Sequence, residues 1–269
     1  MTRLYEPFGF APYLEIDGIL ISNNATTPNT EIDVTAGMCR DSTNTFDLNL
    51  GNYEGAIDSQ DADVTTTIDA TVNGLNGLDT GSLAASSMYY IYVIANPLGS
   101  DPVGLILSLT GPATGPRMPS NYCRYRLVGA IPTDGSSHFV LFDWSGTKNY
   151  RTCKYRTPIA TSITAGNATS YTNINLVTQV PKIDNLPVYI DSAFTPGAAS
   201  RTLSLAPPAS TGYERLITGQ VSSVPVTNTD PITSRLATIS AAIVPSVAYK
   251  VANSGDAAAI NVAGFDLFV

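Results

Sequence analysis

The chain has 269 residues, a formal net charge of −8 and only 13% charged residues, while its hydrophobic fraction is 43%. This acidic, charge-poor composition argues against a nucleic-acid binder, because phosphate binding needs clustered Lys and Arg residues. The sequence contains no run of about 18 apolar residues, so we expect no membrane span. The abundance of Thr, Asn, Gly and Pro favours strands and turns over long helices.

Residues 1–17 combine aromatic side chains with Pro and Gly, which predicts an extended arm that docks onto a partner. Its aromatic anchors would be Tyr5, Phe8, Phe10 and Tyr13. A terminal strand of the following domain is the alternative interpretation. Prolines and a glycine interrupt the apolar residues, so we expect no secretory leader and synthesis in a cytoplasm.

Residues 18–157 have the pattern of a first β-rich domain. The stretches GILISNN, TEIDVTAG and NTFDLNLGN alternate apolar and polar residues and end near Asn or Gly, which predicts strands and turns. In DVTTTIDATVNGLNG the four-residue spacing of Val64, Ile68 and Val72 also fits a helix, but the Thr run favours a strand. MYYIYVIANP reads as a buried strand, with VGLILSLTGP as its hairpin mate across NPLGSD.

The segment RMPSNYCRYRLVGAIPTDGSSHFVLFDWSGT contains the chain's only His and only Trp. Alternation places Cys123, Tyr125 and Leu127 on one face of a predicted strand, with Arg124 and Arg126 on the other. The TDGSS stretch is a turn, and HFVLFDW alternates as the second strand. We therefore expect a β-hairpin here.

Residues 158–185 carry few charges and would form a linker or connecting strands. From 186 to 269 short strands recur at intervals of about 8–14 residues, which favours a C-terminal β-sandwich. The predicted fold class is therefore all-β, with two antiparallel sandwich or barrel units and an extended N-terminal arm.

Motifs for catalysis are weak. The sequence contains no GxSxG motif whose serine could act with His138. We therefore interpret His138 as a surface or half-buried strand histidine. A Cys123–His138 dyad would lack an orienting group. An Asp pair such as Asp61 and Asp63, beside Asp58, keeps open a glycosidase alternative.

The three cysteines, Cys39, Cys123 and Cys153, have unrelated spacings and are best interpreted as isolated core residues. A Cys123–Cys153 pair is an alternative, because hairpin strands would bring the two close. We predict no catalytic residue, no cofactor and no metal ligand.

Charge is distributed unevenly along the chain. Residues 41–116 contain nine acidic residues and no Lys or Arg, whereas residues 117–156 hold seven of the 14 basic residues. The two groups either form solvated faces or pair across neighbouring sheets or subunits. Under the second interpretation, Arg124 and Arg126 are candidate interface residues.

The same segment resembles a module of bacteriophage virion structural proteins, such as tail-fibre-like, head-fibre and capsid-decoration proteins. The resemblance rests on Pro116, Pro119, Tyr122, Arg126, Gly129, Ala130, the TDGSS turn, Phe142 and Gly146. Three further stretches are similar: IDVTAGMCRDSTNTFDLNL, GLNGLDTGSLAASSMYYIYVIANP and INVAGFDLFV. The chain departs from the pattern at RMPSNYCRY, which replaces a small-residue turn and adds Cys123.

This resemblance implies a non-enzymatic virion protein, assembled in the bacterial cytoplasm, that stabilises the particle or takes part in host adsorption. The expected partners are capsid, neck or tail proteins, further copies of itself in a trimer, and a host surface glycan. Nucleic acid and membrane are not expected partners. A virion-associated polysaccharide-binding protein or depolymerase is the alternative.

Overall fold

We describe residues 16–51, 65–97, 101–147, 150–208, 215–219, 223–239 and 242–268 of a computed structural model of the chain. The arm anchors Tyr5, Phe8, Phe10 and Tyr13 lie outside these ranges. So do the carboxylate candidates Asp58, Asp61 and Asp63.

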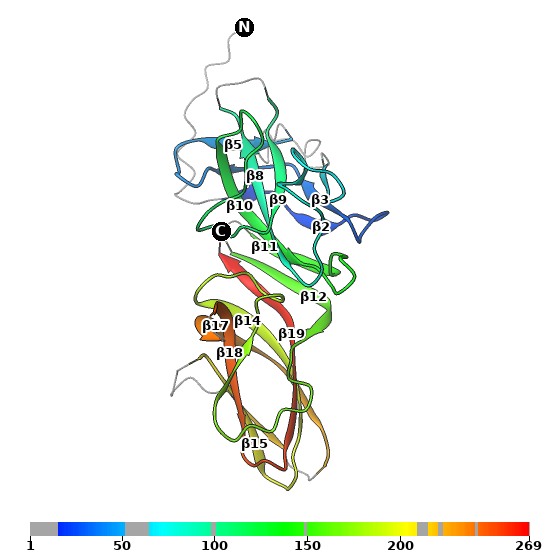
Figure 1. Cartoon of the computed structure of the whole chain (residues 1–269), viewed down its shortest axis with the longest axis vertical. Coiled ribbons are helices and arrows are strands. Elements are labelled where there is room, and N and C mark those ends of the chain that lie inside the picture. The colour runs from blue at the N-terminus through cyan, green and yellow to red at the C-terminus, as the bar shows by residue number, and fades with distance from the viewer. Residues whose placement is uncertain are drawn as a thin grey trace.

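Every regular element in the described ranges is a β-strand, which confirms the all-β prediction. Figure 1 shows an elongated molecule, with the sheets of the first half of the chain at one end and a large sheet from the second half at the other. Antiparallel pairing dominates, and β7 with β9 forms a parallel exception. The predicted antiparallel units are therefore present.

Three sheets build the N-terminal part of the molecule. They have the strand orders β1-β4-β5, β2-β3-β6 and β10-β8-β9-β7. The strands are β1 (Ile16–Gly18), β2 (Ile21–Asn23), β3 (Glu31–Thr35), β4 (Gly37–Arg40), β5 (Asp47–Leu50), β6 (Thr65–Asp69), β7 (Gly77–Leu78), β8 (Met88–Ala95), β9 (Gly104–Ser108) and β10 (Arg124–Pro132). All eight residues of β8 are buried, so this strand is covered on both faces.

A nine-stranded sheet builds the C-terminal part. Its order is β11-β12-β19-β14-β17-β18-β15-β16, and β13 pairs with β18 beside this path. The strands are β11 (Phe142–Thr147), β12 (Tyr150–Ala160), β13 (Thr172–Asn175), β14 (Leu186–Thr195), β15 (Arg201–Ala206), β16 (Arg215–Gly219), β17 (Val226–Ile239), β18 (Ala242–Val251) and β19 (Ala257–Phe268). β17 pairs with β14 up to Ser234 and with β18 from Arg235 onward, so one strand serves two neighbours.

The buried apolar residues form one continuous cluster that extends through both parts of the molecule. Gly129 of β10 illustrates how close the sheets approach. A Cβ added there would lie 2.3 Å from Ile21 Cδ1 and 3.6 Å from the Trp144 ring. A larger residue here would require the Ile21 side chain to move, because side chains of neighbouring sheets pack over this position.

The hairpin that we predicted between residues 123–129 and 138–144 is wrong. β10 pairs instead with β8, and β11 pairs with β12 in the other sheet. Only the isolated bridge between Thr133 and Phe139 joins the two stretches. Phe139 and Phe142, three residues apart, are both buried, so residues 138–144 do not alternate as one strand.

β10, which ends at Pro132, belongs to an N-terminal sheet, whereas β11, which begins at Phe142, belongs to the nine-stranded sheet. The expected domain limit at residue 157 falls inside β12, and residues 158–185 contain β13. β12 belongs to the large sheet, and one of its ends lies near the N-terminal sheets (Figure 1). The division into domains at 17, 157 and 185 stays a prediction.

Candidate functional site: a polar pocket at the Asp134–His138 turn

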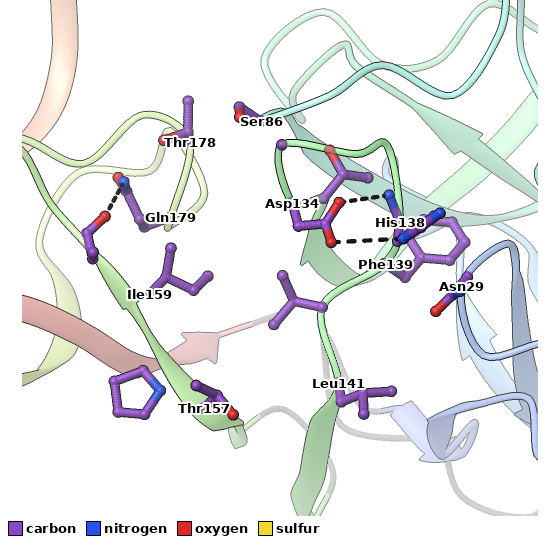
Figure 2. A pocket seen from close by; sticks show the side chains of 15 residues that line it. Asn29, Ser86, Asp134, His138, Phe139, Leu141, Thr157, Ile159, Thr178 and Gln179 are labelled. Atoms are coloured by element: carbon purple, nitrogen blue, oxygen red, sulfur yellow. Dashed lines mark hydrogen bonds and ion pairs between the residues drawn. The ribbon is translucent and has the colours of Figure 1, made fainter.

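A pocket of about 600 Å³ lies between the turn that follows β10 and the C-terminal end of β12. Figure 2 shows Thr157, Ile159, Thr178 and Gln179 along one side, with Asp134, His138, Phe139 and Asn29 along the other. The residues that line it are Asn29, Ser86, Thr133, Asp134, Gly135, His138, Phe139, Val140, Leu141, Thr157, Pro158, Ile159, Ala160, Thr178 and Gln179. Both parts of the chain thus contribute to one pocket.

The turn on one side of the pocket is held by Asp134. Its Oδ1 accepts hydrogen bonds from the backbone N–H groups of Ser136 at 2.8 Å and His138 at 2.9 Å. Ser137 takes a left-handed conformation with φ of 60°, and the Asp134 carbonyl accepts a hydrogen bond from the Ser86 N–H. The predicted TDGSS turn is confirmed. Its Asp134 side chain accepts hydrogen bonds from the backbone N–H groups that follow it, as Asp commonly does in turns.

The other side of the pocket forms where the pairing of β12 with β19 is interrupted. The register between β12 and β19 shifts between Lys154 and Ile159, so the residues between them depart from the ladder. The Arg156 N–H donates to the Leu141 carbonyl at 2.9 Å, which ties this departure to the opposite wall. The pocket therefore follows from this break in the pairing of β12 with β19.

Gln179 closes this side from the segment after β13. Its Nε2 donates to the Ala160 carbonyl at 3.4 Å, and its backbone carbonyl accepts a hydrogen bond from the Tyr155 hydroxyl. Burial raises the pKa of Tyr155 well above its usual value, so this hydroxyl stays a donor. The Gln179 Oε1 is buried without a hydrogen-bond partner among the described residues.

The pocket offers hydrogen-bonding groups but no recognisable nucleophile arrangement. His138 Nδ1 lies 3.7 Å from Asp134 Oδ2, and its side chain is 45% exposed. In Figure 2 the Ser86 side chain and the His138 ring lie on different sides of Asp134. The surface position predicted for His138 is confirmed, although the residue follows a turn and is not in a strand.

The Cys123–His138 dyad is also excluded. Cys123 precedes Arg124, which pairs with Ala95 at one end of β8, whereas Pro132, at the His138 end of β10, pairs with Met88 at the other end. The length of a buried eight-residue strand separates the two positions.

All three cysteines are free. Cys39 and Cys153 are buried, as expected, and the exposed Cys123 contradicts the prediction of a core position. The proposed Cys123–Cys153 pair is wrong, because the two belong to segments that join different sheets. Burial raises the pKa of Cys39 to about 12, although Arg126 and Arg151 oppose this.

The structure places Arg124 and Arg126 beside the acidic segment. Arg124 Nη1 lies 3.3 Å from Asp41 Oδ2, and its guanidinium lies 4.5 Å from the centre of the Phe46 ring. Arg126 is buried, and burial lowers its pKa while Cys39 and Asp41 raise it. The acidic and basic segments thus meet within the chain at this point, and an intermolecular role for the two arginines stays a prediction.

Sequence reasoning missed the wall formed by Thr157, Thr178 and Gln179. These residues belong to no motif, and only the register shift of β12 brings them opposite the Asp134 turn. The turn itself was visible from its Asp-Gly pair.

Among the described residues, no group of three or more His, Cys, Asp or Glu side chains is placed to hold a metal ion. The same ranges contain no helix with the length and apolarity to cross a membrane. Compared with known proteins, the chain matches no family model, no curated protein and no solved structure. The fold and pocket therefore define an all-β protein with a pocket of mixed polar and apolar lining between its sheets.

Proposed function

We propose that the chain is a non-enzymatic structural protein of a bacteriophage particle, either a short fibre or a subunit that decorates the capsid or tail. Its N-terminal region would attach to capsid, neck or tail proteins. Its β units would then face outward on the virion, where they stabilise the particle or meet the host surface. The sequence resemblance of residues 18–146 supports this proposal.

The elongated arrangement of antiparallel sheets around one continuous core is the structural observation that favours it most. Such a molecule holds its two ends apart, which suits a spacer or decoration role. The lining of the Asp134 pocket supports binding over catalysis, because His138 is oriented by Asp134 without a nucleophile beside it.

Several large apolar side chains are exposed on the described strands and loops, which supports contacts with other subunits. They include Leu216 at 62%, Phe268 at 60%, Ile243 at 55% and Leu109 at 52%. Such side chains mark protein–protein contacts where they gather into one patch, whereas single exposed ones are normal on a protein surface. We propose a homotrimer as the assembled form.

Particle incorporation tests the proposal directly. We expect the full-length chain to co-purify with virions. A variant that lacks residues 1–15, and so keeps the buried Ile16 of β1, should remain folded by circular dichroism but be missing from the particles. Equal incorporation of the truncated variant would remove the docking arm from the proposal. Absence of the full-length chain from purified virions would overturn the proposal itself.

Oligomeric state gives a second test. Light scattering at micromolar concentration should report a mass of several chains, against 28.3 kDa for one chain. A stable monomer would contradict the trimer.

A further inference from the structure

The pocket at the Asp134–His138 turn has the size and setting of a ligand site. Its volume of about 600 Å³ falls within the roughly 300–1,000 Å³ typical of small-molecule pockets. Pockets of this kind occur preferentially where two structural units meet, as here.

The chemistry of the lining selects the kind of ligand. Seven neutral or imidazole side chains with hydroxyl, amide or ring nitrogen groups border it: Asn29, Ser86, Thr133, His138, Thr157, Thr178 and Gln179. Asp134 is the acidic member, and no Lys or Arg is among the described lining residues. A phosphate or carboxylate ligand would find no fixed cation here, whereas a polyhydroxylated neutral molecule would find many donors and acceptors.

Apolar groups complete the pocket. Leu141 is 42% exposed, and Ile159 and Pro158 border the same space. A pyranose ring has a face of C–H groups and a rim of hydroxyls, so it needs this combination of apolar and polar wall. A purely polar wall would favour bound water over a sugar.

The walls are already fixed by contacts within the chain. The Phe139 N–H donates to the Asn29 carbonyl at 2.9 Å, and the Ser86 N–H donates to the Asp134 carbonyl at 2.8 Å. Gln179 is only 8% exposed, and its Nε2 donates to the Ala160 carbonyl, which fixes this side chain in the wall. Preorganised polar groups reduce the entropy lost when a ligand binds.

We propose that this pocket binds one neutral sugar unit of a surface glycan. The inference deepens the proposed function, since it gives the outward-facing β units a ligand class and a place to hold it. Asp134, Thr157 and Thr178 would contact the sugar hydroxyls, while Leu141 and Ile159 pack against its C–H face.

The experiment is a titration of the full chain followed by saturation-transfer NMR and calorimetry. The probes are the methyl glycosides of glucose, galactose, N-acetylglucosamine and rhamnose, with glucuronate and inorganic phosphate as anionic comparators. We expect saturable binding of at least one neutral glycoside, with a dissociation constant on the order of 1 mM, as for a single sugar unit in a preformed site.

Two variants locate the binding. Thr157 is exposed in the wall, so Thr157→Trp should fill the space and weaken binding at least about tenfold. Thr233→Trp, at an exposed position of β17 outside the pocket, is the matched control and should bind as the parent does. Thr178→Val removes a hydroxyl without changing the volume and should weaken binding several-fold, which keeps the test decisive if the Trp variant unfolds.

Binding of no neutral glycoside, a preference for glucuronate or phosphate, or equal binding by Thr157→Trp and Thr233→Trp would each overturn the sugar site. These outcomes are independent of particle incorporation. If the chain is found in virions but binds no sugar, the proposed function stands and the sugar site is overturned. If the chain binds a sugar but is absent from virions, the sugar site stands and the proposed function is overturned.

Discussion

The guanidinium of Arg151 donates a hydrogen bond from Nη2 to the Gly18 carbonyl at 2.9 Å, and Nη1 donates to the neighbouring carbonyl of Ile19. Arg151 belongs to β12 of the nine-stranded sheet, whereas Gly18 ends β1 of the N-terminal part. Gly18 and Ile19 both have positive φ, so the chain turns there and presents two carbonyls in one direction. A side chain that is only 2% exposed thus joins the two parts of the molecule.

Removal of this guanidinium should weaken the whole fold. Arg151→Met keeps much of the side-chain length but removes the donor to the buried Ile19 carbonyl and the partly buried Gly18 carbonyl. We therefore expect a loss of about 2–4 kcal/mol in the free energy of unfolding. Urea denaturation at pH 7 measures it.

Arg156→Met is the matched control on the same strand. The ion pair of Arg156 with Asp143 is exposed on both sides, at 57% and 69%, and should contribute less than about 1 kcal/mol. Equal losses for the two variants would show that the Arg151 contact does not hold the parts together.

Asp41, like Arg151, is a buried charged residue whose hydrogen bonds stabilise the fold. Its carboxylate accepts hydrogen bonds from the backbone of Thr45 at 2.7 Å and of Phe46 at 3.1 Å, and from the Thr43 hydroxyl at 2.6 Å. Burial raises its pKa, but these hydrogen bonds and Arg124 outweigh that effect, so the pKa is lowered from 3.8.

Because the folded chain binds this proton less tightly than the unfolded chain, Asp41 stabilises the fold above pH 3.8 and loses that effect as the pH falls further. We expect Asp41→Asn to lower the free energy of unfolding by about 1–3 kcal/mol at pH 7, with a smaller difference at pH 3. Denaturation curves at the two pH values test this. A difference that grows towards pH 3 would contradict the assigned role.

Local patterns in the sequence predicted the strands well. The alternation of TEIDVTAG corresponds to β3, with its buried Ile32 and Val34, and the MYYIYVIANP run corresponds to β8. The Asp-Gly pair predicted the Asp134 turn. These features depend on neighbouring residues, so the local sequence is sufficient for them.

Strand pairing was less predictable, because it depends on residues far apart in the chain. β10 and β11 flank a turn that is typical of a hairpin, yet β10 pairs with β8, and β11 pairs with β12. The burial of both Phe139 and Phe142 decides against the hairpin, and alternation alone does not reveal it. The pocket was missed for the same reason, since it arises from the register shift in β12.

Gly264 of β19 should tolerate no side chain. Its φ is 149°, and a Cβ there would lie 2.1 Å from the Cys153 carbonyl oxygen of β12. We expect Gly264→Ala to destabilise the chain by about 2 kcal/mol or more, because the two strands cannot separate without breaking their ladder.

The control is Gly135→Ala in the Asp134 turn, where an added Cβ meets no atom within 4 Å. This variant should keep the thermal midpoint of the parent within about 2 °C, as an ordinary surface substitution does. If Gly264→Ala unfolds at the same temperature as Gly135→Ala, the close approach of β12 and β19 is wrong.

The three thiols should differ in reactivity. Cys123 is exposed, whereas Cys39 and Cys153 are buried and burial raises the pKa of both, to about 12 for Cys39. Because the thiolate is the reactive form, a disulfide reagent at pH 8 should modify one thiol rapidly in the native chain and all three in denaturant. Cys123→Ser should abolish the fast phase and leave two slow thiols. Rapid reaction of a second thiol in the native chain, or a fast phase that survives in Cys123→Ser, would show that Cys39 or Cys153 is reached by solvent and that the core around them opens more readily than its packing indicates.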